Sequence, residues 1–121
     1  MANKRNLKKQ VRYICGDLAG ECIMARDFIE GIDADKMNDV ILRIAGLQVN
    51  SLKNASFSFD KTPKSYASLK EYHKAAHTYY NEAYKTFYAE FNKQVEEIVK
   101  AMNALLPKAQ REINKTIASL D

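Results

Sequence analysis

The chain has few of the residues that interrupt helices or build turns. It contains four glycines, two prolines and no tryptophan among 121 residues. Because Gly and Pro are poorly tolerated inside helices, their scarcity favours a helical protein with few turns. No apolar run approaches the roughly 20 residues that a membrane-spanning helix needs, so we expect no membrane partner. A chain of this length forms one domain, and we expect residues 1–121 to make a single helical bundle.

The two cysteines are too few and too far apart for a disulfide framework. Cys15 and Cys22 lie seven residues apart on one expected helix, which separates their backbones by about 10 Å. A disulfide tolerates roughly 7 Å at most, so we interpret both as small buried hydrophobic side chains. The basic start of the chain leads directly into an amphipathic pattern, without the continuous hydrophobic region of a signal peptide. We therefore expect a cytoplasmic protein.

The net charge of +4 comes from the N-terminal arm of the chain. Five cations precede the first acidic residue, namely Lys4, Arg5, Lys8, Lys9 and Arg12. Cations are unfavourable at the N-terminal end of a helix, so a role other than helix stability is suggested. Phosphate binding through counterion release is one such role. Nucleic-acid association is therefore our alternative function, although no helix-turn-helix signature accompanies the arm.

Apolar residues recur at three- and four-residue steps over the first half of the chain, which predicts two helices. The first covers residues 4–30, with Gly31 as its stop. The second begins near Asp33 or Asp35, either of which can cap it, and fades between residues 52 and 57. Because the link between the two helices is short, we expect them to run antiparallel. The expected buried residues of the second helix are Met37, Val40, Ile41, Ile44, Ala45, Leu47 and Leu52.

The longest predicted helix runs from Ser65 to Leu106 without Gly or Pro. At about 100° per residue, Leu69, Phe87 and Leu105 fall on one line. An apolar stripe follows that line along the whole helix, and polar residues occupy the opposite side. We expect this stripe to be buried throughout its length.

Both ends of the long helix leave alternatives open. It starts either after Thr62, with Pro63 in the first turn, or at a capping box that begins at Ser68. Pro107 disfavours helix at the residue before it, and residues 108–120 form either a kinked continuation or a short helix that folds back. The predicted fold class is all-α: an up-down antiparallel bundle of three long helices plus a short C-terminal helix after Pro107.

The three helices are unequal in length. At about 1.5 Å per residue, the first two measure roughly 35–40 Å and the third about 60 Å. The shorter helices cannot cover the whole apolar stripe of the third, so its excess must be buried by the C-terminal segment, by the preceding loop or by another chain. In that loop we expect Phe57 and Phe59 to pack against the end of the bundle. The surplus stripe leads us to predict a homodimer.

Two surfaces are candidates for such a contact. Gly16 and Gly20 lie nearly opposite the apolar stripe of the first helix, and each costs about 0.8–1 kcal/mol relative to Ala. Close approach of another helix, from this chain or a second copy, explains them; tolerated surface glycines are the alternative. The tyrosines of the long helix suggest a half-buried interface, with stacking of single-stranded bases as the alternative. The predicted interface residues are Tyr13, Gly16, Gly20, Ile23, Met24, Tyr72, Tyr79, Tyr80, Tyr84 and Tyr88.

No pattern of catalytic residues is present. His73 and His77, the only two histidines, are weak candidates for a metal site, because zinc needs three or four ligands. Cys15 or Cys22 could supply a third ligand, but we interpret the histidines as a packed or rim pair. There is no Gly-rich phosphate loop, nucleophile elbow or acid–base cluster, so we expect neither enzymatic activity nor a cofactor. The predicted function is that of a non-enzymatic helical interaction or scaffold protein, self-associating through the first and third helices.

The opening MANKRNLKKQVRYICGDLAGEC resembles a group of small, uncharacterised bacterial helical proteins that begin almost identically, with Tyr and Cys at the positions of Tyr13 and Cys15. A second similar patch is FNKQVEEIV, residues 91–99. The resemblance implies a helical bundle and carries no functional residues. The Tyr-rich segment, residues 65–87, departs from the shorter members of the group.

Overall fold

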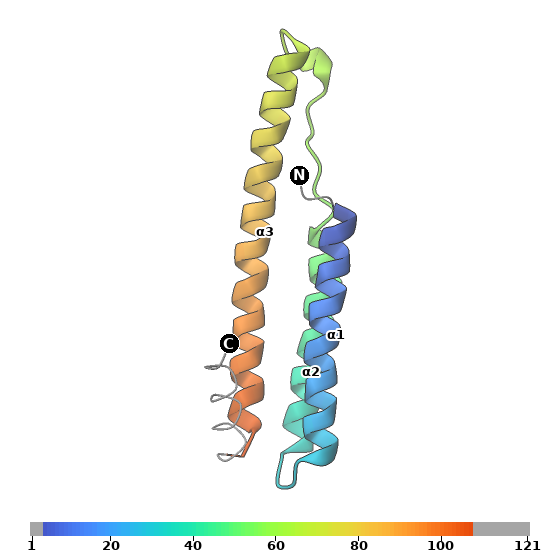
Figure 1. Cartoon of the computed structure of the whole chain (residues 1–121), viewed down its shortest axis with the longest axis vertical. Coiled ribbons are helices and arrows are strands. Elements are labelled where there is room, and N and C mark those ends of the chain that lie inside the picture. The colour runs from blue at the N-terminus through green and yellow to red at the C-terminus, as the bar shows by residue number, and fades with distance from the viewer. Residues whose placement is uncertain (1–3, 108–121) are drawn as a thin grey trace.

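The computed structural model describes residues 4–107, and every regular element in that range is a helix. Figure 1 shows α1 and α2 side by side and running in opposite directions, while α3 lies beside them and continues well past their ends. None of the described helices is long and apolar enough to cross a bilayer. The short helix predicted after Pro107 lies outside the described residues. The elements are α1 (Lys4–Phe28), α2 (Ala34–Asn54), the short 3-10 helix η1 (Pro63–Ser65) and α3 (Leu69–Leu105).

The turn between α1 and α2 follows from local sequence signals. Gly31 has a φ of 79°, in the left-handed region that glycine adopts without strain. Asp33 caps α2, because its side-chain oxygen accepts a hydrogen bond of 3.1 Å from the backbone N–H of Lys36. Both residues therefore act as predicted, and Asp33 rather than Asp35 is the cap.

The start of α3 settles the choice between its two predicted caps. Ser68 Oγ accepts a hydrogen bond of 3.2 Å from the backbone N–H of Glu71, as in a capping box. Thr62 and Pro63 instead begin the separate helix η1. At the other end, Leu106 is extended, with φ −75° and ψ 144°, as expected for the residue before Pro107.

The fully buried side chains lie where α1, α2 and the C-terminal half of α3 meet. Cys15 and Cys22 are fully buried and unpaired, and burial raises the pKa of both thiols, which confirms their interpretation as hydrophobic side chains. The predicted burial of Ala45 is wrong, because α2 faces α3 on the other side, where Arg43 pairs with Glu97. The buried residues of this core are Val11, Leu18, Ala25, Met37, Val40, Ile44, Leu47, Phe91, Ile98, Met102 and Leu106, with both cysteines. Leu7 and Ala55 are also buried, outside this cluster.

The two halves of α3 differ in burial. The three fully buried residues of the helix, Phe91, Ile98 and Met102, all lie in its packed half, residues 89–105. In the aromatic half, residues 69–88, every side chain is half-buried or exposed, and Leu69 is 61% exposed. The described residues therefore leave the stripe incompletely covered at this end, and its burial by the C-terminal segment or by another chain stays a prediction. Neither α1 nor α2 extends as far as the first turns of α3 (Figure 1).

Candidate interaction surfaces

The loop between α2 and α3, residues 55–68, runs beside the aromatic half of α3 (Figure 1). Its Phe57 ring packs edge-on against Tyr84, with centroids 5.0 Å apart. Phe59 packs against Tyr79 at 5.3 Å, and its backbone N–H donates a 3.2 Å hydrogen bond to Tyr80 Oη. Phe57 and Phe59 thus hold the loop, as predicted, but along the flank of α3 rather than at the end of the bundle. We call the residues Phe57, Phe59, Tyr66, Tyr72, Tyr79, Tyr80 and Tyr84 the aromatic cluster.

The start of α1 is joined to the aromatic cluster through a cation. Lys4 Nζ lies 5.6 Å from the ring centroids of both Phe57 and Tyr80, within the range of a cation–π interaction. Further along α1, Gln10 Oε1 accepts a 3.1 Å hydrogen bond from Tyr88 Oη. Lys4 therefore differs from the other cations of the N-terminal arm, because it has an aromatic partner within the chain.

The predicted interface tyrosines of α3 are all half-buried. The structure brings Tyr72, Tyr79, Tyr80 and Tyr84 together against the loop and directs Tyr88 towards α1. Burial, and then the neighbouring Tyr88 and Tyr80, raise the pKa of Tyr84. These residues make contacts inside the chain and keep part of their surface exposed. Their contact with a second chain stays a prediction.

The outer face of α1 is exposed and partly apolar. Tyr13 is 71% and Met24 63% exposed, and Ile23 lies near them. A Cβ atom added at Gly16 or Gly20 would meet nothing within 4 Å. Close packing of a helix from this chain is therefore wrong within the described residues, and close packing of a second copy stays a prediction.

The remaining cations of the N-terminal arm share one face of α1. Their positions fall within about 100° of the helical circumference, and Arg5, Lys9 and Arg12 are exposed while Lys8 is half-buried. Across residues 4–107, no ion pair engages any of the four. The face is positively charged over the first three turns and continues into Gly16 and Gly20.

The histidines are exposed on the aromatic half of α3. His77 Nε2 lies 3.1 Å from Asn81 Nδ2, and the His73 ring packs against Tyr72. In the described part of the chain, no group of three or more His, Cys, Asp or Glu residues is placed to hold a metal. A third ligand from Cys15 or Cys22 is wrong, because both thiols are enclosed in the core.

Sequence reasoning missed exposed apolar residues on α1 and α2. Phe28 is 78% exposed at the end of α1, and Leu42 and Val49 on α2 are 69% and 67% exposed. The seven-residue spacing of Leu42 and Val49, with Gly46 between them, was a signal for a shared helix face. The sequence pattern instead predicts burial of Ala45, their neighbour.

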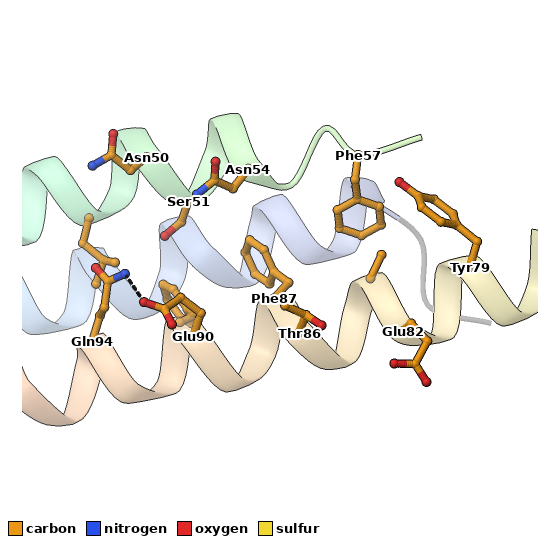
Figure 2. Close-up of a pocket in the computed structure, with 13 residues that line it drawn as sticks. Asn50, Ser51, Asn54, Phe57, Tyr79, Glu82, Thr86, Phe87, Glu90 and Gln94 are labelled. Atoms are coloured by element: carbon orange, nitrogen blue, oxygen red, sulfur yellow. Dashed lines mark hydrogen bonds between the residues drawn. The ribbon is translucent and has the colours of Figure 1, made fainter. Parts of the chain in front are cut away.

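Sequence reasoning also missed a groove of about 500 Å³ between the end of α2, the loop and α3 (Figure 2). Its walls come from residues 47–57 and 79–94, which only the folded chain brings together. The apolar side chains that line it are Leu47, Phe57, Ala83, Phe87 and Phe91, and its polar lining includes Asn50, Asn54, Glu82, Glu90 and Gln94.

Comparisons with known proteins found no match. No protein family, no curated protein and no solved structure matches this chain. The resemblance of residues 1–22 and 91–99 to small bacterial helical proteins therefore stays a prediction.

Proposed function

We propose that this protein is a non-enzymatic helical interaction protein that forms a homodimer through the outer face of α1 and the aromatic half of α3. In this proposal the three helices form an up-down bundle, and the segment after Pro107 adds a fourth, short helix. In this proposal the protein is cytoplasmic. A further protein partner would bind the same surfaces. The observation that carries the proposal is the incomplete covering of α3.

The aromatic half of α3 is covered only in part. The loop covers the flank with Tyr72 and Tyr79, through Phe59. Leu69 and His73 lie on exposed positions of the same helix. Because exposed apolar surface marks contacts with other molecules, the uncovered first turns of α3 support docking of a second chain.

The outer face of α1 suits close approach of a helix. Gly16 and Gly20 have open space around them, and Tyr13 and Met24 add exposed apolar surface on either side. Two glycines weaken the isolated helix by about 0.8–1 kcal/mol each relative to Ala. A contact between two copies of α1 offsets that cost.

The test is the mass of the protein in solution. At high micromolar concentration we expect light scattering to give the mass of a dimer. Gly16→Leu combined with Gly20→Leu should leave the fold intact, because each added side chain meets open space in the monomer, but should block close approach and give a monomer. Gly46→Leu on α2 is the matched control, since its surroundings are equally open. A monomeric mass for the unmodified protein would refute the dimer.

Nucleic-acid association is the second candidate, supported by the exposed cations on one face of α1. Its test is binding to generic DNA and RNA over a range of salt concentrations. Micromolar affinity with a steep salt dependence would favour it over a scaffold role alone. Replacing Arg5, Lys9 and Arg12 by Glu should lower the salt slope by about two to three units. The same change at Lys85, Lys93 and Lys100 on α3 is the control.

A further inference from the structure

We propose that the groove between α2, the loop and α3 binds a lipophilic organic cation, a compact apolar body that carries one positive charge. The groove shares residues 79–87 of α3 with the aromatic half proposed for self-association, and the rest of its lining lies outside the predicted interface residues. The volume of the groove, about 500 Å³, lies within the range of small-molecule sites.

The apolar part of the groove is built from residues that the fold already holds in place. Phe87 and Phe91 stack with centroids 6.0 Å apart and planes 12° from parallel, and Phe91 and Leu47 are buried at the base. Phe57 forms the end wall, where its contact with Tyr84 fixes the ring. A ligand with a flat or branched apolar body would therefore meet preformed aromatic surface.

The charge of the groove is opposite to that of the protein as a whole. The described residues that line it include Glu82 and Glu90 but no Lys, Arg or His, whereas the chain carries a net charge of +4. Figure 2 shows the Glu82 carboxylate turned away from the groove and Glu90 at its rim. Glu90 Oε1 accepts a 3.1 Å hydrogen bond from Gln94 Nε2, which orients the carboxylate. Glu90 is thus the negative group that would face a bound cation.

The aromatic rings add to the preference of the groove for a positively charged ligand. The face of an aromatic ring attracts cations, and Lys4 Nζ already lies 5.6 Å from the Phe57 ring. A ligand would lie with its charge nearer to Glu90 than to Lys4 and with its apolar surface against the rings. An anion of the same shape would face Glu90 and the negative faces of the rings, so the groove should discriminate by the sign of the charge.

Two ions of the same shape and opposite charge test this inference. Calorimetric titration of the whole chain with tetraphenylphosphonium and with tetraphenylborate should show the cation binding at least about tenfold more tightly. The net positive charge of the protein by itself favours the opposite order, so the result separates groove binding from non-specific attraction. Equal or tighter binding of the borate, or no binding of either ion at millimolar concentration, would overturn the proposal.

Variants locate the site. Glu90→Gln should weaken binding of tetraphenylphosphonium about fivefold. Glu96→Gln makes the same charge change at an exposed position outside the groove and should leave binding unchanged. Ala83→Trp should fill the groove and abolish binding, with its fold checked by circular dichroism. Equal effects of Glu90→Gln and Glu96→Gln would also overturn the proposal, whatever the oligomeric state proves to be.

Discussion

The two halves of α3 are one continuous helix in two environments. The packed half, residues 89–105, lies against α2, where Arg43 pairs with Glu97 at 3.2 Å, and it buries Phe91, Ile98 and Met102. The aromatic half, residues 69–88, faces the loop and has no fully buried side chain. Side chains without polar atoms, such as Phe91 and Ile98, suit complete burial, whereas tyrosines can place their rings in a contact and their hydroxyl groups in water. The composition of each half therefore matches how completely it is covered.

The largest expected difference between the halves is in the cost of removing a side chain. Ile98→Ala should lower the free energy of unfolding by about 2–5 kcal/mol, because it leaves a cavity in the core. Leu69→Ala should change it by about 0.5 kcal/mol or less, because Leu69 is 61% exposed. Urea unfolding of the two variants measures both values. Similar losses of unfolding free energy in the two variants would contradict the difference in packing between the two halves of α3.

A second expected difference between the core and the aromatic half of α3 is in how their contributions to stability depend on pH. The buried thiols of Cys15 and Cys22 have pKa values above the ordinary value of 9.0, so the folded chain keeps their protons while the unfolded chain releases them. Their contribution to stability is complete below pH 9 and is lost as pH rises towards the folded pKa, by about 1.4 kcal/mol per pH unit for each thiol. Urea unfolding from pH 7 to 10 measures the decline.

The control for this pH dependence is a variant with Cys15→Ala and Cys22→Ala, which should show a shallower decline. Tyr84 in the aromatic half, whose pKa is also raised, contributes only from about pH 10 upwards. An identical decline in the variant would show that the thiols are not its cause.

The smallest expected effect is within the aromatic cluster. Tyr80→Phe removes the hydroxyl that accepts the hydrogen bond from the Phe59 backbone and should lower the free energy of unfolding by about 1 kcal/mol. Tyr72→Phe removes a hydroxyl from the same cluster, and no hydrogen bond to it is present among residues 4–107, so its effect should be smaller. Thermal unfolding compares the two variants, and equal effects would argue against the loop contact.

The sequence predicted the ends of the helices well because their causes are local. Gly31, Asp33 and Ser68 each act within three residues of their own position, and all three behave as their residue types indicate. The buried face of α1 was predictable as well, because α2 and the packed half of α3 are long enough to cover its apolar stripe.

The sequence could not show which segment, if any, packs against a given side of a helix. Leu69 continues the apolar periodicity of α3, but its burial depends on how far α1 and α2 extend. Ala45 and Leu42 lie close together on α2, and only the position of α3 decides which side of that helix is covered. The groove has the same origin, because Phe57 and Phe87 come to line it through the course of the loop rather than through any spacing in the sequence.

The loop and the aromatic half of α3 run side by side between shared end points, so their lengths are coupled. An extended chain advances about 3.3 Å per residue and a helix about 1.5 Å. Removing two turns of helix would leave the loop about three residues too long and would misplace Phe57 relative to Tyr84. Related chains of different length should therefore gain or lose residues in both segments together, at roughly two helical residues for each loop residue.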